Sequence, residues 1–421
     1  MSELKKTLGP VSGAALMLNI VIGAGLLTLP GLAAQAAGPL AIYSWAVCAI
    51  AAVPLLIVFI IMGRRYPDAG GIAHFAELAF GRYGYIAASL LFLGAVIFGL
   101  PAIAMTGGYY LASVIDVDPA LAALVLLLAG AVCQTASPQK ASKIATAIAS
   151  TVIFVLLGMI AVGYWGVDFT SAPVGLSLPF IHDIPLIMAP VLMIFFAFTG
   201  WEVAAGISEE FKNPKRDFPI AMILSFAATI TLYMLMAFLI NVSPTVGNSE
   251  AAFAVLIGNV LGPWGQNAVA LIAGLIILSN LMGAIWAVSR MIYALSRQQV
   301  LPVMLTVDEA GRPLGAVALL VVALALVLLL DYANLLSISD MLHMAGQNFL
   351  LLYGVGAMAL MVLVRNVASR VIALIAFMIV AALMIYVGDF IGYPAALCLL
   401  AVLIWRMQRK NAQPVVTGAP G

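Results

Sequence analysis

Charged residues are scarce in this sequence, and their scarcity excludes an ordinary water-soluble domain. Only 8% of the 421 residues are charged and 65% are hydrophobic, whereas a typical soluble domain carries about 25% charge. The net charge is only +1, so nucleic acid is not an expected partner, because phosphate binding needs a basic surface. The composition is typical of a protein that lies in a lipid bilayer.

Motifs for metal binding, nucleophilic catalysis and phosphate binding are also missing. The cysteines at positions 48, 133 and 398 are isolated in apolar runs, without the paired spacing of metal or redox sites. The histidines are scattered, and neither a Gly-x-Ser-x-Gly pattern nor a Walker pattern occurs. We therefore expect no enzyme activity, no cofactor and no metal site.

Apolar residues form long runs that short polar segments separate. A membrane-spanning helix needs about 20 apolar residues, and twelve such helices fit the sequence. We predict them at residues 10–36, 40–63, 84–115, 119–136, 141–165, 186–210, 218–241, 265–297, 314–330, 334–364, 368–388 and 390–407.

The lysines and arginines fall in or beside every second interval between these runs, beginning with Lys5 and Lys6. Basic residues next to a membrane helix resist translocation, so these intervals are expected to face the cytoplasm. A bundle of apolar helices favours a plasma membrane over an outer membrane, which takes barrels of short strands. We predict a multi-pass protein of the bacterial inner (plasma) membrane, with a cytoplasmic N-terminus (1–9) and a cytoplasmic tail (408–421).

Two of the predicted helices contain glycine at mid-depth, the first in residues 22–26 (IGAGL) and the sixth in residues 198–202 (FTGWE). Glycine weakens a helix by up to about 1 kcal/mol, and matched interruptions in two halves of a chain are typical of inverted-repeat transporters. A close contact between two straight helices is the alternative.

The fold class that follows is an all-α membrane protein with 12 transmembrane helices in a 5+5 inverted repeat, in which helices 1 and 6 are broken. The first repeat is predicted at 10–165 and the second at 186–364, with accessory helices at 368–407. An odd number of helices in each repeat inverts the second repeat in the membrane.

A broken helix leaves N–H groups free at the start of one half and C=O groups free at the end of the other. Near the positive end of a helix dipole, free N–H groups can hold a carboxylate. The predicted carboxylate contacts are the N–H groups of Gly23, Ala24 and Gly25, and the predicted ammonium contacts are the carbonyls of Val21, Phe196 and Thr199. This arrangement predicts an α-amino acid or a similar small zwitterion as the ligand.

Other residues near the breaks are expected to set the side-chain preference, although packing is the alternative role for each aromatic one. These residues are Phe98, Met105, Phe195, Phe196, Phe198, Ala284 and Asn348. Helices one, three, six and eight carry Glu202 as their single midplane charge, and an unpaired charge is costly to bury. Neutral substrates such as methionine, leucine, isoleucine and valine are therefore favoured.

Three titratable residues are candidates for coupling or gating. Glu202 begins the second half of helix six, where it can cap the helix, act as a protonation switch, or do both. Asp340 and His343 lie on one face of helix ten and could pair to accept a proton, or could serve only as a polar tether between helices.

These features together resemble the amino acid/polyamine/organocation superfamily. The segments that carry the resemblance are 23–25 with 30–31, 67–71 with 80–81, 196–202, and 212–219. The resemblance implies a LeuT-type fold, substrate binding at 23–25 and 196–199, and export by alternating access with proton antiport. Proton-coupled members carry a lysine in helix five, where residues 147–151 read AIAST, so coupling to sodium, exchange or no coupling at all stay open.

The expected partners are a small neutral amino acid, a proton or alternatively sodium, and the lipid bilayer. A cationic amino acid or polyamine exchanger is a second hypothesis. A non-transporting nutrient receptor, or a subunit of a larger assembly, is a third. The sequence leaves the oligomeric state open.

Overall fold

The computed structural model describes residues 8–21, 23–68, 71–135, 157–166, 179–206, 208–243, 249–301, 306–308, 312–386 and 391–411. Within these ranges the secondary structure is helical except for one isolated bridge between Leu8 and Phe211. Long apolar segments form helices in lipid because a helix satisfies its own backbone hydrogen bonds.

The first part of the chain contains α1 (Pro10–Val21), α2 (Ala24–Ala37), η1 (Gly38–Leu40), α3 (Ala41–Arg65), α4 (Gly71–Ala112), α5 (Pro119–Val132) and η2 (Cys133–Thr135). An unlabelled helix follows at Leu157–Gly166. The next part contains η3 (Ile181–Asp183), α7 (Ile184–Met188), α8 (Val191–Phe195), η4 (Phe196–Phe198), α9 (Trp201–Gly206), η5 (Ser208–Glu210) and α10 (Asp217–Val242). The last part contains α11 (Ala252–Arg297), α12 (Leu314–Tyr332), α13 (Ile338–Leu363), α14 (Val367–Tyr386) and α15 (Gly392–Asn411).

Among the described residues, 7 helical segments are long and apolar enough to cross a membrane, or up to 8 if the pair Ile181–Met188 and Val191–Phe198, bent by 52°, is one span. The shorter apolar helices Pro119–Val132 and Leu157–Gly166 fall on the predicted fourth and fifth helices. Most of the predicted fifth helix, 141–165, lies outside the described residues. The number of twelve therefore stays a prediction, as do the boundaries of the two repeats.

Helices α4 and α11 each begin with an extra helical segment that the hydropathy pattern does not predict. The chain turns between this segment and the long apolar part at Gly81 (φ 66°, ψ −157°) and at Gly262 (φ 71°, ψ −167°). A β-carbon on either glycine would meet no atom within 4 Å, so glycine is required by its positive φ rather than by lack of space. Helices α4 and α11 thus have the same construction, a short segment and a long apolar part joined at a glycine with positive φ.

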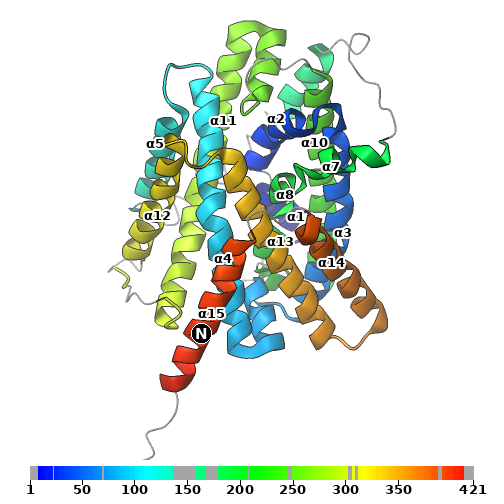
Figure 1. Cartoon of the computed structure of the whole chain (residues 1–421), viewed down its shortest axis with the longest axis vertical. Coiled ribbons are helices and arrows are strands. Elements are labelled where there is room, and N and C mark those ends of the chain that lie inside the picture. The colour runs from blue at the N-terminus through cyan, green and yellow to red at the C-terminus, as the bar shows by residue number, and fades with distance from the viewer. Residues whose placement is uncertain are drawn as a thin grey trace, which may run out of the picture.

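Helix α4 occupies the middle of the bundle and packs against α5, α11, α13 and α15. In its most apolar window 78% of the residues are buried, compared with 33% for α12 and for α14. In Figure 1, α4 and α13 cross near the centre while α12 and α14 lie at opposite sides. The breaks described below therefore lie against central helices, and the outer helices leave apolar side chains exposed for lipid.

Candidate functional site

The first interruption separates α1, which ends at Val21, from α2, which begins at Ala24. Gly23 lies between them with φ −139° and ψ −139°, which is neither helical nor extended, and no side chain of the described residues caps α2. The first N–H groups of a helix have no carbonyl within that helix to bond. The start of α2 is therefore an electropositive backbone site without a side-chain cap.

The second interruption separates η4, which ends at Phe198, from α9, which begins at Trp201. Gly200 has φ +108°, a conformation that favours glycine. Thr199 closes the end of η4, because its N–H donates to the carbonyl of Phe196 at 3.2 Å and its hydroxyl donates to the same carbonyl at 2.7 Å. This carbonyl has a partner inside its own segment.

The two interruptions touch each other. A β-carbon added to Gly25 would lie 3.1 Å from Cβ and 3.2 Å from Cα of Ala197, in η4. A β-carbon added to Gly23 would lie 2.7 Å from Nδ2 of Asn280, in α11. Glycine at these positions thus allows the start of α2 to lie close to the backbone of η4 and to the side chain of Asn280, in α11.

Buried tyrosines from neighbouring helices brace the first interruption. The hydroxyl of Tyr233, in α10, donates to the carbonyl of Val21 at 3.1 Å, and the hydroxyl of Tyr110, in α4, donates to the carbonyl of Leu27 at 2.9 Å. Sequence reasoning missed both residues. No local pattern marks them, because each partner lies on a helix remote in the chain.

Glu202 is buried at the start of α9 and bonds across the second interruption. Its Oε1 and Oε2 accept from the N–H of Gly200 at 3.1 and 2.9 Å, and its Oε2 accepts from the hydroxyl of Tyr353, in α13, at 2.5 Å. The carboxylate thereby neutralises a helix start from within the chain. Tyr353 is a further residue that sequence reasoning missed.

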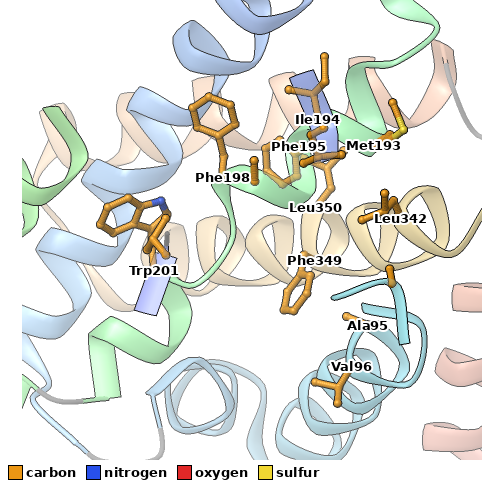
Figure 2. Close-up of a cluster of buried hydrophobic side chains, with 14 of the residues drawn as sticks. Ala95, Val96, Met193, Ile194, Phe195, Phe198, Trp201, Leu342, Phe349 and Leu350 are labelled. Carbon is orange, nitrogen blue, oxygen red and sulfur yellow. The ribbon is translucent and has the colours of Figure 1, made fainter. Parts of the chain in front are cut away.

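Two of the aromatic residues predicted beside the breaks are packed into the core. Phe198 lies between Trp45 and Tyr233, with ring centroids 6.1 and 5.6 Å apart, and Phe195 lies on Tyr353 at 5.7 Å. Figure 2 shows both side chains in a cluster to which α4, α8, η4 and α13 contribute. Met105 is likewise buried, in α4.

Phe196 differs from its neighbours because its side chain is only half-buried. Its ring lies 6.2 Å from that of Phe349, in α13, and its Cε2 would be 2.9 Å from a β-carbon on Gly99, in α4. Gly99 is a fourth missed position. A glycine within an apolar helix is its only signal in the sequence, because it marks a close approach.

Of two other predicted lining residues, Phe98 contacts α15 and Asn348 lies beside Gly94, in α4. The ring of Phe98 lies 5.1 Å from that of Tyr393, and Oδ1 of Asn348 lies 3.3 Å from the β-carbon position of Gly94, which also adjoins Tyr393. Ala284 is half-buried in α11, one turn after the Asn280 that contacts Gly23.

Asp340 and His343 do not pair with each other in the structure. Asp340 forms a capping box at the start of α13, where its Oδ2 accepts from the N–H and the hydroxyl of Ser337 at 2.9 and 2.6 Å. Nδ1 of His343 lies 2.8 Å from the carbonyl of Ser339, and its Nε2 lies 3.4 Å from the carbonyl of Ala189. Instead of pairing, Asp340 caps the start of α13 and His343 contacts the bend between α7 and α8.

Two solved structures share this architecture. A Na+-coupled sialic acid symporter matches 97% of this chain and 91% of its own chain with a TM-score of 0.59 and 14% identity. MhsT, solved in complex with L-phenylalanine, matches 92% of this chain and 100% of its own with a TM-score of 0.60 and 14% identity. These likenesses confirm the predicted all-α, LeuT-type transporter fold.

The family follows from the sequence itself. The family model described as amino acid permease matches residues 8–414, so the chain belongs to that family. The uncharacterized amino acid permease YecA of Bacillus subtilis is 30% identical over 308 residues, which are 72% of each chain. The L-methionine/branched-chain amino acid exporter YjeH of Escherichia coli is 32% identical over 236 residues, 55% of this chain and 56% of that one. The chain is therefore an amino acid transporter and not an enzyme.

Proposed function

We propose that this transporter exports methionine, leucine, isoleucine and valine by alternating access, driven by proton antiport. The similarity to an exporter of methionine and branched-chain amino acids supports these substrates and this direction. The distribution of basic residues supports an orientation in the bacterial inner membrane with both termini in the cytoplasm.

One observation carries the proposal: the uncapped start of α2 lies directly against η4 at the contact of Gly25 with Ala197. The N–H groups of Gly23, Ala24 and Gly25 are proposed to hold the substrate carboxylate, because a helix start attracts a negative charge. The ammonium is proposed to bind at the ends of the preceding helical segments.

The proposed ammonium ligands are the carbonyls of Val21, Phe196 and Thr199. The carbonyl of Val21 accepts one hydrogen bond, from Tyr233, and a carbonyl oxygen has two lone pairs, so acceptor capacity remains there. The carbonyl of Phe196 accepts both the N–H and the hydroxyl of Thr199, so an ammonium is proposed to displace one of these two bonds. The tyrosine and the threonine are therefore proposed to position the ammonium site.

A neutral side chain is proposed for the substrate because the carboxylate at the second interruption already accepts hydrogen bonds from the protein. Glu202 accepts hydrogen bonds from Gly200 and Tyr353, and a cationic substrate would need a carboxylate free to pair with it. The half-buried ring of Phe196, backed by Gly99 and Phe349, is proposed as the apolar wall. Phe195 and Phe198 support this wall from the core, and Ala284 is proposed to adjoin it from α11.

Coupling is proposed to act through Glu202, because protonating this carboxylate would remove the charge that stabilises the start of α9. Asp340 and His343 are proposed as secondary groups that link the start of α13 to the α7–α8 bend. Phe98 and Asn348 are proposed to act indirectly, through the packing of α4 and α13 on α15.

Flux measured with purified protein in liposomes tests this proposal. Labelled leucine and methionine are followed under an imposed proton gradient, an imposed sodium gradient and no gradient, with protein-free liposomes as the control. We expect flux driven by the proton gradient. Flux driven only by sodium would overturn proton antiport, and no flux of either amino acid would overturn the substrate assignment.

A cationic substrate is the second candidate, favoured by one group of relatives. Cationic amino acid transporter 5 of Arabidopsis thaliana is 27% identical over 351 residues, 76% of this chain and 60% of that one. Competition of arginine and putrescine against labelled leucine separates the two candidates. Stronger competition by arginine than by unlabelled leucine would establish the cationic alternative.

A further inference from the structure

A group of hydrogen bonds joins α4, α11 and α15. Nε of Arg82, in α4, donates to Oε1 of Gln408, in α15, at 3.0 Å, and Nη1 of Arg82 donates to Oε1 of Gln298, at the end of α11, at 2.7 Å. Nη2 of Arg82 and Nε2 of Gln408 both donate to the carbonyl of Gln298, at 2.7 and 3.2 Å. We call these three residues the Arg82 cluster. It attaches the end of α15 to α4 and α11, and α15 packs along α4 (Figure 1).

Two further arginines adjoin the Arg82 cluster in the sequence. Arg297 precedes its residue in α11, and Arg409 follows its residue in α15. The guanidinium carbon of Arg297 lies 5.9 Å from the ring centroid of Tyr293, one turn earlier in α11. The guanidinium carbon of Arg409 lies 4.8 Å from the ring centroid of Trp405, one turn earlier in α15. The hydrogen bonds of the cluster therefore bring both arginine–aromatic pairs to the same end of the bundle.

Neither Arg297 nor Arg409 is paired with an acid in the described part of the chain. Both side chains are exposed, and the ion pairs among the described residues are those of His74, His182 and Arg312. A guanidinium that stacks on a ring uses its face, so the N–H groups at its edge stay available to an oxyanion. The structure thus holds two oriented cations without a counter-ion from the protein.

An apolar surface of α15 leads up to these arginines. Its exposed side chains recur at a spacing of four, which places them on one face of the helix, and they are Leu399, Leu403 and Met407. Apolar side chains on such a face contact acyl chains in a bilayer, whereas tryptophan and tyrosine are enriched at the level of the lipid headgroups. The two aromatic rings therefore place the two arginines at headgroup level.

We propose that Arg297 and Arg409, held together by the Arg82 cluster, form a binding site for the headgroup of an anionic phospholipid. Its phosphate accepts from the two guanidinium groups, and its acyl chains lie along the exposed apolar face of α15. A zwitterionic headgroup fits less well, because it brings a cation of its own next to two arginines. The inference rests on the proposed orientation, which turns this end of the bundle toward the cytoplasmic leaflet, where anionic lipids lie.

Substitutions of arginine by glutamine test the site and leave its aromatic rings in place. Arg297→Gln and Arg409→Gln each remove one exposed cation, and the double variant removes both. Arg365→Gln is the matched control, because Arg365 is also exposed and lies between α13 and α14, on the same predicted side of the membrane. Size-exclusion chromatography shows which variants fold, and the two single variants carry the test if the double variant does not.

The fluorescence of Trp405 reports which lipid occupies the site. Full-length protein is reconstituted into vesicles that contain brominated phosphatidylglycerol or brominated phosphatidylcholine, because bromine quenches tryptophan emission at short range. The same variants carrying Trp405→Phe give the emission of the other tryptophans, and subtraction leaves the signal of Trp405. In the parent protein and in Arg365→Gln, quenching should favour phosphatidylglycerol by about 25-fold, since each arginine contributes about fivefold. This preference should fall about fivefold in each single variant and disappear in the double variant.

Three results would overturn the lipid site. The first is equal quenching of the parent protein by the two lipids, and the second is a preference for phosphatidylglycerol that survives in the double variant. The third is a preference that free glycerol 3-phosphate abolishes, which would assign the arginines to a soluble phosphate. Leucine flux, measured on the same vesicles, keeps the two proposals apart: absent flux with an intact preference for phosphatidylglycerol would refute the proposed substrate and leave the lipid site standing.

Discussion

The two interruptions obtain negative charge from different sources. The second interruption contains its own carboxylate, because Glu202 accepts from the N–H of Gly200 and from Tyr353. The first interruption has only Gly23 at the corresponding place, and no side chain of the described part of the chain caps α2. A helix start favours a nearby anion in both cases, and we propose that at the first interruption the substrate carboxylate is that anion.

The two interruptions also differ in how neighbouring helices stabilise them. The interruption at Gly200 is complete within the protein and is stabilised by α13 through Tyr353. The interruption at Gly23 is braced on its carbonyl side by Tyr233 but stays open on its N–H side. In the proposed function, the first interruption binds the ligand and the second controls the binding conformation.

The largest effect is expected where the two interruptions touch. Gly25→Val should strongly weaken leucine binding, because a β-carbon there would meet Ala197 at 3.1 Å and valine adds two further carbons. Overpacking of this kind costs about 1 to 3 kcal/mol, or roughly fivefold to 150-fold in affinity. Scintillation proximity with labelled leucine measures the loss.

Gly283→Val is the control for this change, because Gly283 lies in α11 and a β-carbon on it would meet no atom within 4 Å. It should bind leucine normally. Unchanged leucine affinity in a folded Gly25→Val variant would show that the contact between the interruptions is not part of the binding site.

The next largest effect concerns the carboxylate at the second interruption. Glu202→Gln keeps the side-chain shape but loses a charged acceptor for Gly200 N–H, and a hydrogen bond to a charged group contributes about 1.5 to 3 kcal/mol. Proton-driven leucine flux should fall by about tenfold or more and lose its dependence on pH. Tyr353→Phe is the control, because it keeps the charge of Glu202 and should retain the pH dependence. A preserved pH profile in Glu202→Gln would restrict Glu202 to capping.

A moderate effect on selectivity is expected at Gly99. Gly99→Ala places a β-carbon 2.9 Å from Cε2 of Phe196, which should push the ring toward the substrate. Fit of one methylene group in a pocket is worth about 1 to 3 kcal/mol. Competition assays should therefore show about a tenfold loss for leucine and methionine relative to alanine.

Gly274→Ala is the control, because its β-carbon would lie at an ordinary 3.5 Å from Leu111. Equal losses for large and small amino acids in Gly99→Ala would mean that the substitution damages packing rather than selectivity.

The smallest effect is expected from Tyr233→Phe, which removes one hydroxyl from the carbonyl of Val21. A hydrogen bond between neutral groups contributes about 1 kcal/mol, so leucine affinity should weaken roughly fivefold. Tyr164→Phe removes a comparable hydroxyl, which donates to the carbonyl of Leu235 away from both interruptions, and should leave affinity unchanged. Equal affinities in the two variants would exclude Tyr233 from positioning the ammonium site.

Much of the fold could be predicted from hydropathy and glycine alone. Apolar runs predict the long helices. The glycine segment 22–26 directly follows the end of α1 and contains the start of α2, and the segment 198–202 contains the end of η4 and the start of α9. The helical segments before Gly81 and Gly262 were not predicted, because each is shorter than a membrane span and hydropathy alone does not mark so short a helix.

The binding site was harder to predict because adjacent residues of a helix point about 100° apart. Phe98 was expected at the site, yet it contacts α15, while its neighbour Gly99 faces Phe196. Asn348, also predicted near the breaks, lies with its Oδ1 3.3 Å from the β-carbon position of Gly94, in α4. Which of two neighbouring positions faces the interruption depends on how each helix is rotated against its neighbours, and one sequence carries no record of that rotation.

The sequence by itself determined that this chain lies in a membrane as a helical bundle and where its helices can be interrupted, because hydrophobicity and the conformational freedom of glycine are local properties. Only the tertiary structure decided that Tyr353 bonds Glu202, that Tyr233 bonds Val21, and that Leu8 bonds the segment after η5. Each of those contacts joins residues that are far apart in the chain, and it forms only when helix packing brings one donor to one acceptor.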